Sequence, residues 1–404
     1  MNIVFASASG ALGGAETSLL AVMKSVRDEN PTWKLTLLTG ESGSLVSEAS
    51  RLGIGTVTLQ FPQQLGQIGD SSLKGSRKGL GRLRYVGRLV RAGASAIAYS
   101  AKLRAALSAD PPDLIHANGF KMQLLCAVAK PGSVRLIWHI HDYVTTRPVV
   151  RWLLALASFR CDDIIANSDS VASNVRQVVR SGVDVTRVYN AVDCTDLSPA
   201  GPAADLDRLA GAPPTAPGVI RVGMVATFAT WKGHDVFLRA IALLDSRLPF
   251  RAYIIGGPLY QTQGSQHTLE DLQAVRSRLG LEKRVGFTGF LKNRAEAFRS
   301  LDVVVHASTE PEPFGMVIIE AMSCGRALVA ASGGGASELT VHDVDSLVHR
   351  RGDAKDLAVQ IERLIRDQEL RTRISTQGRA KALSRFSMTG LAGQLRPIYL
   401  RTSS

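Results

Sequence analysis

The sequence is short of cysteine and of long apolar stretches. Its four cysteines, Cys126, Cys161, Cys194 and Cys324, lack the paired spacing of a zinc site, so they argue against zinc and fit a reducing cytosol. No segment approaches the roughly 18 uninterrupted apolar residues of a membrane-spanning helix, and residues 1–6 lack the basic leader of a secretory signal. The sequence therefore predicts a cytoplasmic protein without a membrane span.

Acidic residues are missing from residues 74–104, although that segment holds nine basic ones. They are Lys74, Arg77, Lys78, Arg82, Arg84, Arg88, Arg91, Lys102 and Arg104. Apolar residues recur among them at helical spacing, which predicts an amphipathic helix with a basic face. Such a helix suits an anionic surface at the inner face of the cell membrane, and a solvated helix is the competing interpretation. Nucleic acid is not predicted as a partner, because no recognised binding motif accompanies the charge.

The length of 404 residues exceeds what one hydrophobic core usually holds, so two domains are expected. Between residues 199 and 218 the composition turns to proline, alanine and glycine, which is poor core material and typical of a linker. We therefore predict an N-terminal domain over residues 1–198, a linker over 199–218 and a C-terminal domain over 219–385.

Both halves alternate short apolar strands with helices. In the first half, strands are expected at residues 3–6, 35–39, 56–59, 113–119 and 135–142. In the second half they are expected at 219–226, 252–257, 303–307 and 327–331. This alternation predicts the α/β class with Rossmann-like parallel sheets. The first glycine loop, at residues 10–14, lacks the Gly-x-Gly-x-x-Gly spacing of a dinucleotide fingerprint.

The most informative stretch is a buried strand at residues 303–307, followed by a Pro/Gly loop that opens directly into a helix. Gly315 lets a ligand approach the main chain, and the N–H groups around Gly315 and Met316 point out of the helix N-terminus. A phosphate would fit there. Glu312 in the loop and Glu320 in the helix frame this site, since the helix rises only about 7 Å between Gly315 and Glu320. Carboxylates accept hydrogen bonds from hydroxyls, so one can hold a ribose and the other a hexose.

The segment from Glu312 to Glu320 resembles the Glu-x7-Glu motif of the retaining glycosyltransferases of family 4. The resemblance extends over most of the chain and implies the GT-B fold, in which two Rossmann-like domains with parallel sheets face a central cleft. It also implies strands at residues 163–168 and 187–193, a strand and loop beside the donor base at 284–290, and a helix over residues 386–404 that crosses back to the N-terminal domain. In that family the second Glu binds the donor ribose and the first contacts the transferred sugar. The donor-binding segment implied here comprises Phe314, Gly315, Met316, Val317 and Glu320.

Further site residues are implied by the same resemblance. Lys232, followed by glycine, matches the family's pyrophosphate-binding lysine, and His141 matches a histidine that reaches the donor sugar or its phosphate. The glycine loops ending at Gly14 and Gly335 complete the expected donor site. The chain departs from the family at Thr227, where an arginine usually serves the same phosphates.

The expected activity is hexosyl transfer, with retention, from a nucleoside diphosphate sugar to an acceptor hydroxyl, in glycolipid, polysaccharide or other glycoconjugate synthesis. Glu312, His141 and Lys232 are the expected catalytic residues, and neither a metal nor a cofactor is predicted. A nucleotide-sugar epimerase and a non-catalytic sugar-nucleotide binding protein stay open as alternatives, the latter because of Thr227.

Overall fold

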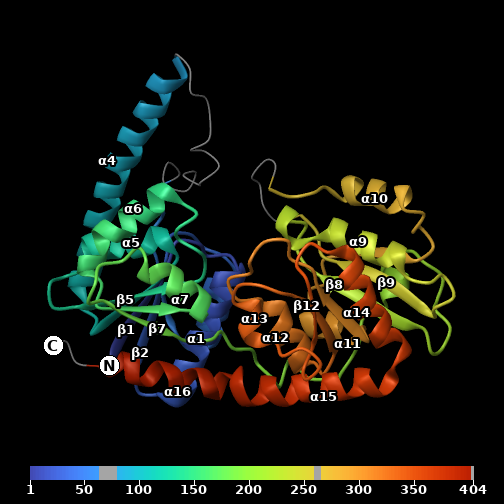
Figure 1. Cartoon of the computed structure of the whole chain (residues 1–404). Helices are drawn as coiled ribbons and strands as arrows, with labels where there is room; N and C mark the ends of the chain where they lie inside the picture. Colours follow the sequence, from blue (N-terminus) through green and yellow to red (C-terminus); the bar gives the residue numbers. More distant parts are fainter. Residues whose placement is uncertain (63–79, 259–264, 402–404) are drawn as a thin grey trace. The chain divides into compact units, whose positions relative to one another are not determined.

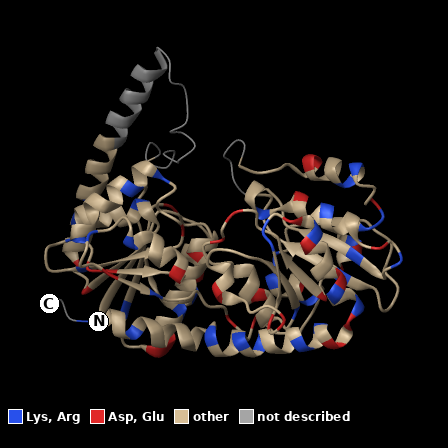
Figure 2. Cartoon of the chain, in the orientation of Figure 1, with Lys and Arg blue, Asp and Glu red and all other residues tan. Residues whose placement is uncertain are grey.

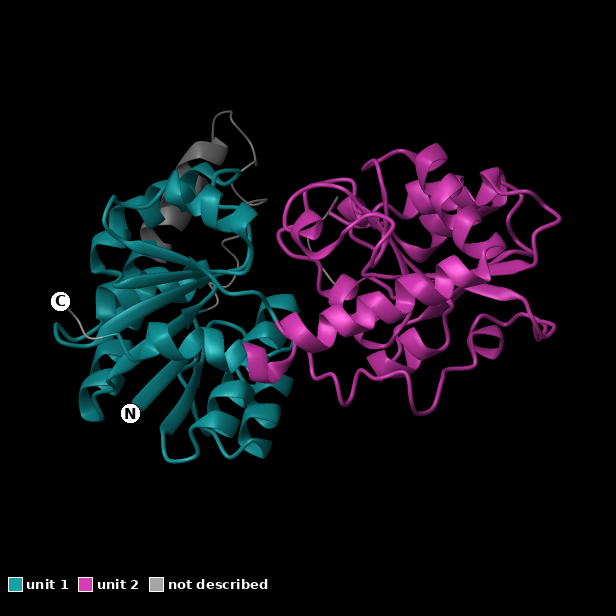
Figure 3. Ribbon diagram, turned by 60° about the horizontal axis from the view of Figure 1, so that its bottom comes forward, with its two compact units in different colours: residues 1–190, 391–404 teal, residues 191–390 magenta. Residues whose placement is uncertain are grey.

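The computed structural model describes residues 1–62, 80–258 and 265–401, and of residues 80–92 it describes only the helical backbone. The chain forms two compact units (Figure 3). Unit 1 comprises residues 1–190 and 391–404, and unit 2 comprises residues 191–390. The boundary between them falls at residue 190 and again inside helix α16 (Met388–Tyr399).

Unit 1 is built on a seven-stranded parallel sheet with the order β3-β2-β1-β4-β5-β6-β7 (Figure 1). Its strands are β1 (Asn2–Ser7), β2 (Lys34–Thr39), β3 (Gly55–Thr58), β4 (Leu114–Asn118), β5 (Arg135–Ile140), β6 (Asp163–Ala166) and β7 (Asp184–Arg187). The strand order reverses between β1 and β4, and open α/β sheets bind ligands at such a point, outside the carboxyl ends of the strands.

Helices cover the sheet of unit 1, which explains why its central strands are almost continuously apolar. They are α1 (Gly14–Glu29), α2 (Ser44–Arg51), α4 (Leu80–Ala109), α5 (Phe120–Ala129), α6 (Pro148–Ala157) and α7 (Asp169–Arg176), with the 3-10 turn η2 (Ser158–Arg160) after α6. None of the helices within the described ranges is long and apolar enough to cross a bilayer. Of the basic segment 74–104, residues 74–79 lie outside the described residues, so its membrane contact stays a prediction.

Unit 2 repeats the plan with six parallel strands in the order β10-β9-β8-β11-β12-β13. They are β8 (Ile220–Val225), β9 (Phe250–Ile255), β10 (Val285–Gly289), β11 (Val303–His306), β12 (Ala327–Ala331) and β13 (Leu347–His349). The helices are α8 (Leu206–Leu209), η3 (Thr230–Lys232), α9 (His234–Leu243), α10 (Leu269–Arg278), α11 (Arg294–Arg299), α12 (Met316–Ser323), α13 (Ala336–Leu339), α14 (Ala354–Arg366) and α15 (Gln368–Arg385). Here the order reverses between β8 and β11.

Residues 199–218, expected as a linker, lie within unit 2. Asp207 is buried there and accepts hydrogen bonds from the Tyr253 hydroxyl (2.6 Å), an Arg251 N–H (2.6 Å) and the Thr215 N–H (2.9 Å). These contacts tie the proline-rich segment to β9. The composition that indicates a linker therefore describes a segment that is held by polar contacts and by the buried Leu206.

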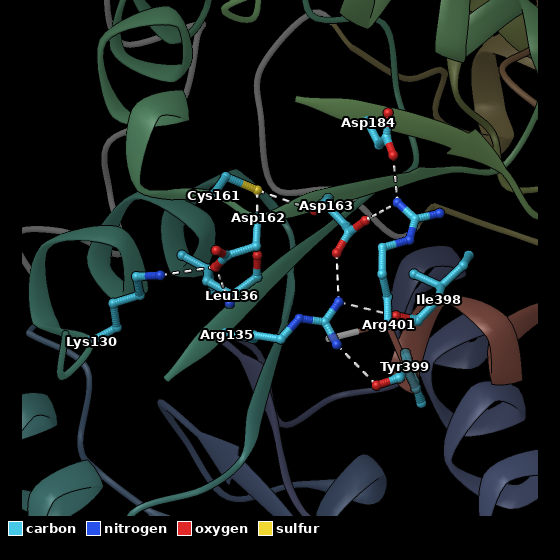
Figure 4. Close-up of polar contacts among 10 residues, drawn as sticks. All are labelled: Lys130, Arg135, Leu136, Cys161, Asp162, Asp163, Asp184, Ile398, Tyr399 and Arg401. Carbon is cyan, nitrogen blue, oxygen red and sulfur yellow. Dashed lines mark hydrogen bonds and ion pairs between the residues drawn. The ribbon is translucent and has the colours of Figure 1, made fainter. Parts of the chain in front are cut away.

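The end of α16 is fixed to the amino ends of β5 and β6 by the buried Arg135 (Figure 4). Its guanidinium donates to the carbonyls of Tyr399 (2.9 Å) and Ile398 (3.0 Å) and to the carboxylate of Asp163 (2.6 Å). Arg401 also donates to Asp163 at 2.6 Å. One arginine thus satisfies two carbonyls at a helix end and one buried carboxylate.

Arg135→Met should lower the free energy of unfolding by about 3 kcal/mol. It leaves the buried Asp163 with less positive charge beside it and leaves two main-chain carbonyls without this donor. Lys34→Met is the matched control, since its ion pair with Asp110 is exposed on both sides and should matter by less than about 1 kcal/mol. Chemical denaturation compares the two variants. Equal, small losses of unfolding free energy in the two variants would show that Arg135 does not fix the end of α16.

Candidate active site

The loop between β11 and α12 ends at Gly315, whose φ of 102° lies in the left-handed region. A Cβ at this position would also come 2.9 Å from Cδ1 of Ile318, so glycine is required. The Ile318 N–H donates to the Gly315 carbonyl at 3.0 Å and starts the helical ladder. The N–H groups before it, at Met316 and Val317, face out of the helix N-terminus, where the helix dipole favours an anion. The Phe314 side chain is buried, so this residue can offer a ligand only its main chain.

Glu312 lies in the same loop, and three side chains hold its carboxylate. Nζ of Lys232 lies 2.9 and 3.1 Å from the two oxygens, and the Ser308 hydroxyl donates to Oε2 at 2.6 Å. Nε2 of His306 lies 3.3 Å from Oε2. Burial acts to raise the pKa of Glu312, but Lys232, His306 and Ser308 together hold this pKa well below its usual range. Glu312 is therefore charged at neutral pH.

The tautomer of His306 follows from its second contact. The N–H of Ala331, at the end of β12, faces Nδ1 of His306 at 3.4 Å. A ring nitrogen that accepts cannot carry the proton of a neutral imidazole, so Nε2 carries it and donates to Glu312. His306 ends β11, and Lys232 lies in the turn after β8, the neighbouring strand. The cluster thus sits at the carboxyl ends of the strands where the order reverses.

Two glycines allow the loops around Glu312 to pack closely. A Cβ at Gly233 would lie 2.0 Å from the carbonyl oxygen of Ala307, and one at Gly335 would lie 2.1 Å from that of Pro313. The N–H of Gly335 donates to the Glu312 carbonyl at 2.8 Å. Gly335 therefore fixes the Glu312 loop, and its contact with a donor stays a prediction.

Glu320 lies one turn into α12 and is only 6% exposed, so it does not face solvent. Nη1 of Arg294, the first residue of α11, lies 2.8 Å from its Oε1. This ion pair occupies one of the two carboxylate oxygens and fixes the orientation of the group. The sequence does not point to Arg294 as a site residue, because nothing in its spacing links α11 to α12.

In unit 1, His141 follows β5 directly, and its Nε2 lies 2.6 Å from Oδ1 of Asn118 at the end of β4. Nδ2 of Asn118 faces the Ala15 carbonyl at 3.4 Å, which orients the amide. An amide oxygen only accepts, so Nε2 of His141 carries the proton and Nδ1 keeps a lone pair. Burial lowers the pKa of His141 to about 4, so the ring is neutral at pH 7. Nδ1 is buried and has no hydrogen-bond partner among the residues that the structure describes.

Behind His141 lies a row of buried aromatic groups that reaches α16. The Tyr399 hydroxyl lies 2.8 Å from Nδ1 of His116, and Nε2 of His116 lies 3.1 Å from Nδ1 of His139. The rings of His139 and His141 are in contact, tilted by 41° with centroids 4.0 Å apart. Burial lowers the pKa of His116 to about 3 and that of His139 well below its ordinary value. The row therefore consists of neutral rings.

Gly14 is the first residue of α1, and a Cβ added there would meet nothing within 4 Å. Packing in unit 1 therefore does not demand glycine at this position. Its neighbour Ala15 faces Asn118, which in turn contacts His141, so Gly14 and His141 lie at the same group of strand ends.

The predicted site residues thus fall into two groups. Unit 2 gathers Lys232 and Glu312 beside Gly315, and unit 1 holds His141 near Gly14. No group of three or more His, Cys, Asp or Glu side chains suited to a metal occurs in the described ranges. Sequence reasoning missed Asn118, His306, Ser308 and Arg294. The position of Asn118 and His306 at strand ends is the signal that could have found two of them.

Two family models match the sequence. The model described as Glycosyltransferase Family 4 matches residues 13–196, and the model described as Glycosyl transferases group 1 matches residues 212–381. Together these matches cover most of the chain.

Among curated proteins, mannosylfructose-phosphate synthase of Agrobacterium fabrum is 31% identical over 41% of this chain and 37% of its own length. A D-inositol 3-phosphate glycosyltransferase of Stackebrandtia nassauensis is also 31% identical, over 59% of this chain and 54% of its own. The chain therefore spans about half or less of these relatives.

Among solved structures, HepE of Anabaena in complex with UDP is 27% identical, with a TM-score of 0.77 over 98% of this chain and 99% of its own. The same protein in complex with UDP-glucose gives a TM-score of 0.76. The two family models match successive halves of the chain, and the chain shares the fold of HepE over its whole length. Both comparisons indicate the same family. The chain belongs to the family 4 glycosyltransferases and has the GT-B fold of two Rossmann-like domains.

Proposed function

We propose that this protein transfers a hexose from a nucleoside diphosphate sugar to an acceptor hydroxyl, with retention of the anomeric configuration. The observation that carries the proposal is the ion pair of Lys232 and Glu312 where the strand order of unit 2 reverses, in the loop that opens α12. This loop cluster offers a cation and a helix N-terminus for a diphosphate, and a carboxylate for sugar hydroxyls.

Lys232 and the first turn of α12 would stabilise the leaving group. As the bond between the anomeric carbon and the diphosphate oxygen breaks, negative charge grows on the diphosphate. A fixed cation and oriented N–H groups therefore bind the transition state more tightly than the ground state. These groups supply the positive charge themselves, so we propose transfer without a metal or cofactor, and turnover should persist in EDTA.

The carboxylates would divide the donor between them. Glu312 is charged at neutral pH and can accept hydrogen bonds from the transferred sugar. Glu320, oriented by Arg294, would accept from the ribose. His141 would accept a substrate hydroxyl at Nδ1, because its other nitrogen already donates to Asn118.

HepE of Anabaena, a relative at 27% identity, is described in complex with UDP and with UDP-glucose, which makes uridine donors the first to test. The acceptor class proposed is a hydroxyl of a glycolipid, polysaccharide or other glycoconjugate. Epimerisation without an acceptor would appear as a changed sugar in the same assay. A non-catalytic protein would bind a donor without turning it over.

Calorimetric titration with UDP-, GDP- and ADP-sugars, followed by product analysis with hydroxyl acceptors, tests the proposal. Glu320→Gln keeps the shape of the side chain but removes its charge, so donor binding should weaken by about 1.5 to 3 kcal/mol. The exposed Glu369→Gln is the control and should bind as the wild type does. A chain that binds none of these donors and forms no product would contradict the proposed function.

Lys232→Ala should lower the turnover rate by about 10²-fold, and donor affinity by less, because the lysine acts on charge that develops in the transition state. Ser308→Ala removes a neutral hydrogen bond from the carboxylate of Glu312 and should lower the turnover rate much less. Without Lys232 the pKa of Glu312 should rise, so the acidic limb of the pH–rate profile moves upward. Steady-state kinetics on both variants would refute the assignment if Lys232→Ala turned over at the wild-type rate.

Asn118→Asp should make activity sensitive to acid near neutral pH. The neutral His141 offers a lone pair at Nδ1, and a carboxylate at Nε2 would raise its pKa by about one to three units from about 4. Below the new pKa the lone pair carries a proton, so the rate should fall where the wild type stays level. Asn118→Ala lowers the rate without moving the acidic limb. A pH–rate profile for Asn118→Asp that matches the wild type would show that His141 does not act as an acceptor.

A further inference from the structure

Helix α6 of unit 1, continued by η2, exposes a row of large apolar side chains. They are Val149 (48% exposed), Trp152 (62%), Leu156 (55%) and Phe159 (63%). Their spacing of three, four and three residues places them on one helix face. Val150 and Leu154 are buried and pack into the core of unit 1, so that core does not use the exposed row. We call these four residues, with Arg151 beside them, the α6 face.

The charged residues of α6 and of the segments next to it are all basic between the flanking Asp142 and Asp162. Residues 143–161 contain no aspartate or glutamate and three arginines (Figure 2). Arg147 pairs with Asp142, and Arg160 donates to main-chain carbonyls, so both are used within unit 1. Arg151 is exposed and lies next to Trp152 in the helix. A surface of this kind attracts an apolar partner that carries negative charge.

The two helices next to α6 in this layer, α5 and α4, also expose apolar side chains. Helix α5 packs against α6 and exposes Val128, and α4 packs against α5 and exposes Ile97 together with Lys102 and Arg104. Exposed apolar side chains therefore occur on α4, α5 and α6, and exposed basic ones accompany them on α4 and α6.

We infer that the α6 face docks on the surface of an anionic lipid bilayer. A helix that lies in a bilayer interface carries Trp, Phe and Leu on one side and cations beside them, and lacks acidic residues at that side. The α6 face meets each condition with exposed residues. Its apolar side chains enter the boundary between headgroups and acyl chains, and Arg151 meets lipid phosphates.

The position of α6 in the chain links this surface to the candidate active site. Pro148, its first residue, comes seven residues after His141, a distance of at most about 23 Å along an extended chain. Docking therefore brings the strand ends with His141 near the headgroups, which suits an acceptor whose hydroxyl is carried on a lipid anchor. This acceptor class rests on the proposed function, whereas the docking does not.

Vesicle sedimentation with the full chain tests the inference, using phosphatidylcholine alone and phosphatidylcholine with phosphatidylglycerol. The double variant Trp152→Ser with Phe159→Ser should bind the anionic vesicles about tenfold more weakly or worse, because it removes two large apolar groups. The matched control is Leu243→Ser with Val359→Ser, two similarly exposed apolar residues of unit 2, which should bind as the wild type does. Arg151→Glu should weaken binding to anionic vesicles only.

Fluorescence keeps the inference testable if the double variant fails to fold. The difference spectrum between wild type and Trp152→Phe should shift to the blue when anionic vesicles are added, since Trp152 leaves water. Calorimetry with a nucleotide sugar should give equal donor affinity for wild type and double variant, which separates docking from donor binding. The inference is overturned if the wild type ignores anionic vesicles at low salt, or if the double variant binds them equally well. It is also overturned if sedimentation shows that the α6 face pairs two copies of the chain.

Discussion

The pairing of Lys232 with Glu312 is the contact around which unit 2 is arranged. Two charges mostly removed from water are costly unless each is well paired. Here the carboxylate receives a cation and the Ser308 hydroxyl, and the His306 ring is aligned on it by a backbone N–H. That arrangement requires β8 and β11 to be neighbouring strands and the loops that follow them to be in contact. Gly233 permits this contact because it has no Cβ. In unit 1 the buried row from Tyr399 to His141 consists of neutral rings, and the buried ion pair of Arg135 with Asp163 lies at the amino ends of the strands.

Much of the fold could be predicted because parallel strands covered on both faces are apolar throughout. The strands at residues 3–6, 303–307 and 327–331 were identified on that basis. The final strand of unit 1 was placed wrongly at residues 187–193, whereas β7 spans Asp184–Arg187. As an edge strand with a polar sequence, β7 lacks the signal, and the buried residues after it are irregular. The short β13 was missed, because its three residues are too few to show a pattern.

The site could be predicted only where residues adjoin in sequence or match the family motif. The Gly315 turn and the start of α12 at Met316 follow from the Pro/Gly loop, and the structure has both. The contact of Lys232 with Glu312 joins residues 80 positions apart, so spacing alone could not show it. The tautomers of His141 and His306 depend on which groups the fold sets beside them, and no sequence pattern encodes that. The roles assigned to these residues in the reaction stay predictions.

The clamp of Arg135 on the end of α16 sets an order of assembly. Unit 2 is one continuous stretch of chain, whereas unit 1 needs residues from both sides of it. During synthesis, the first 190 residues leave the ribosome without Ile398, Tyr399 and Arg401, so Asp163 and His116 lack partners they have in the finished protein. The apolar core of unit 1 lies wholly within the first 190 residues and can collapse early, whereas its polar contacts with α16 must wait for the end of the chain. Unit 1 is completed last, after unit 2 has been made.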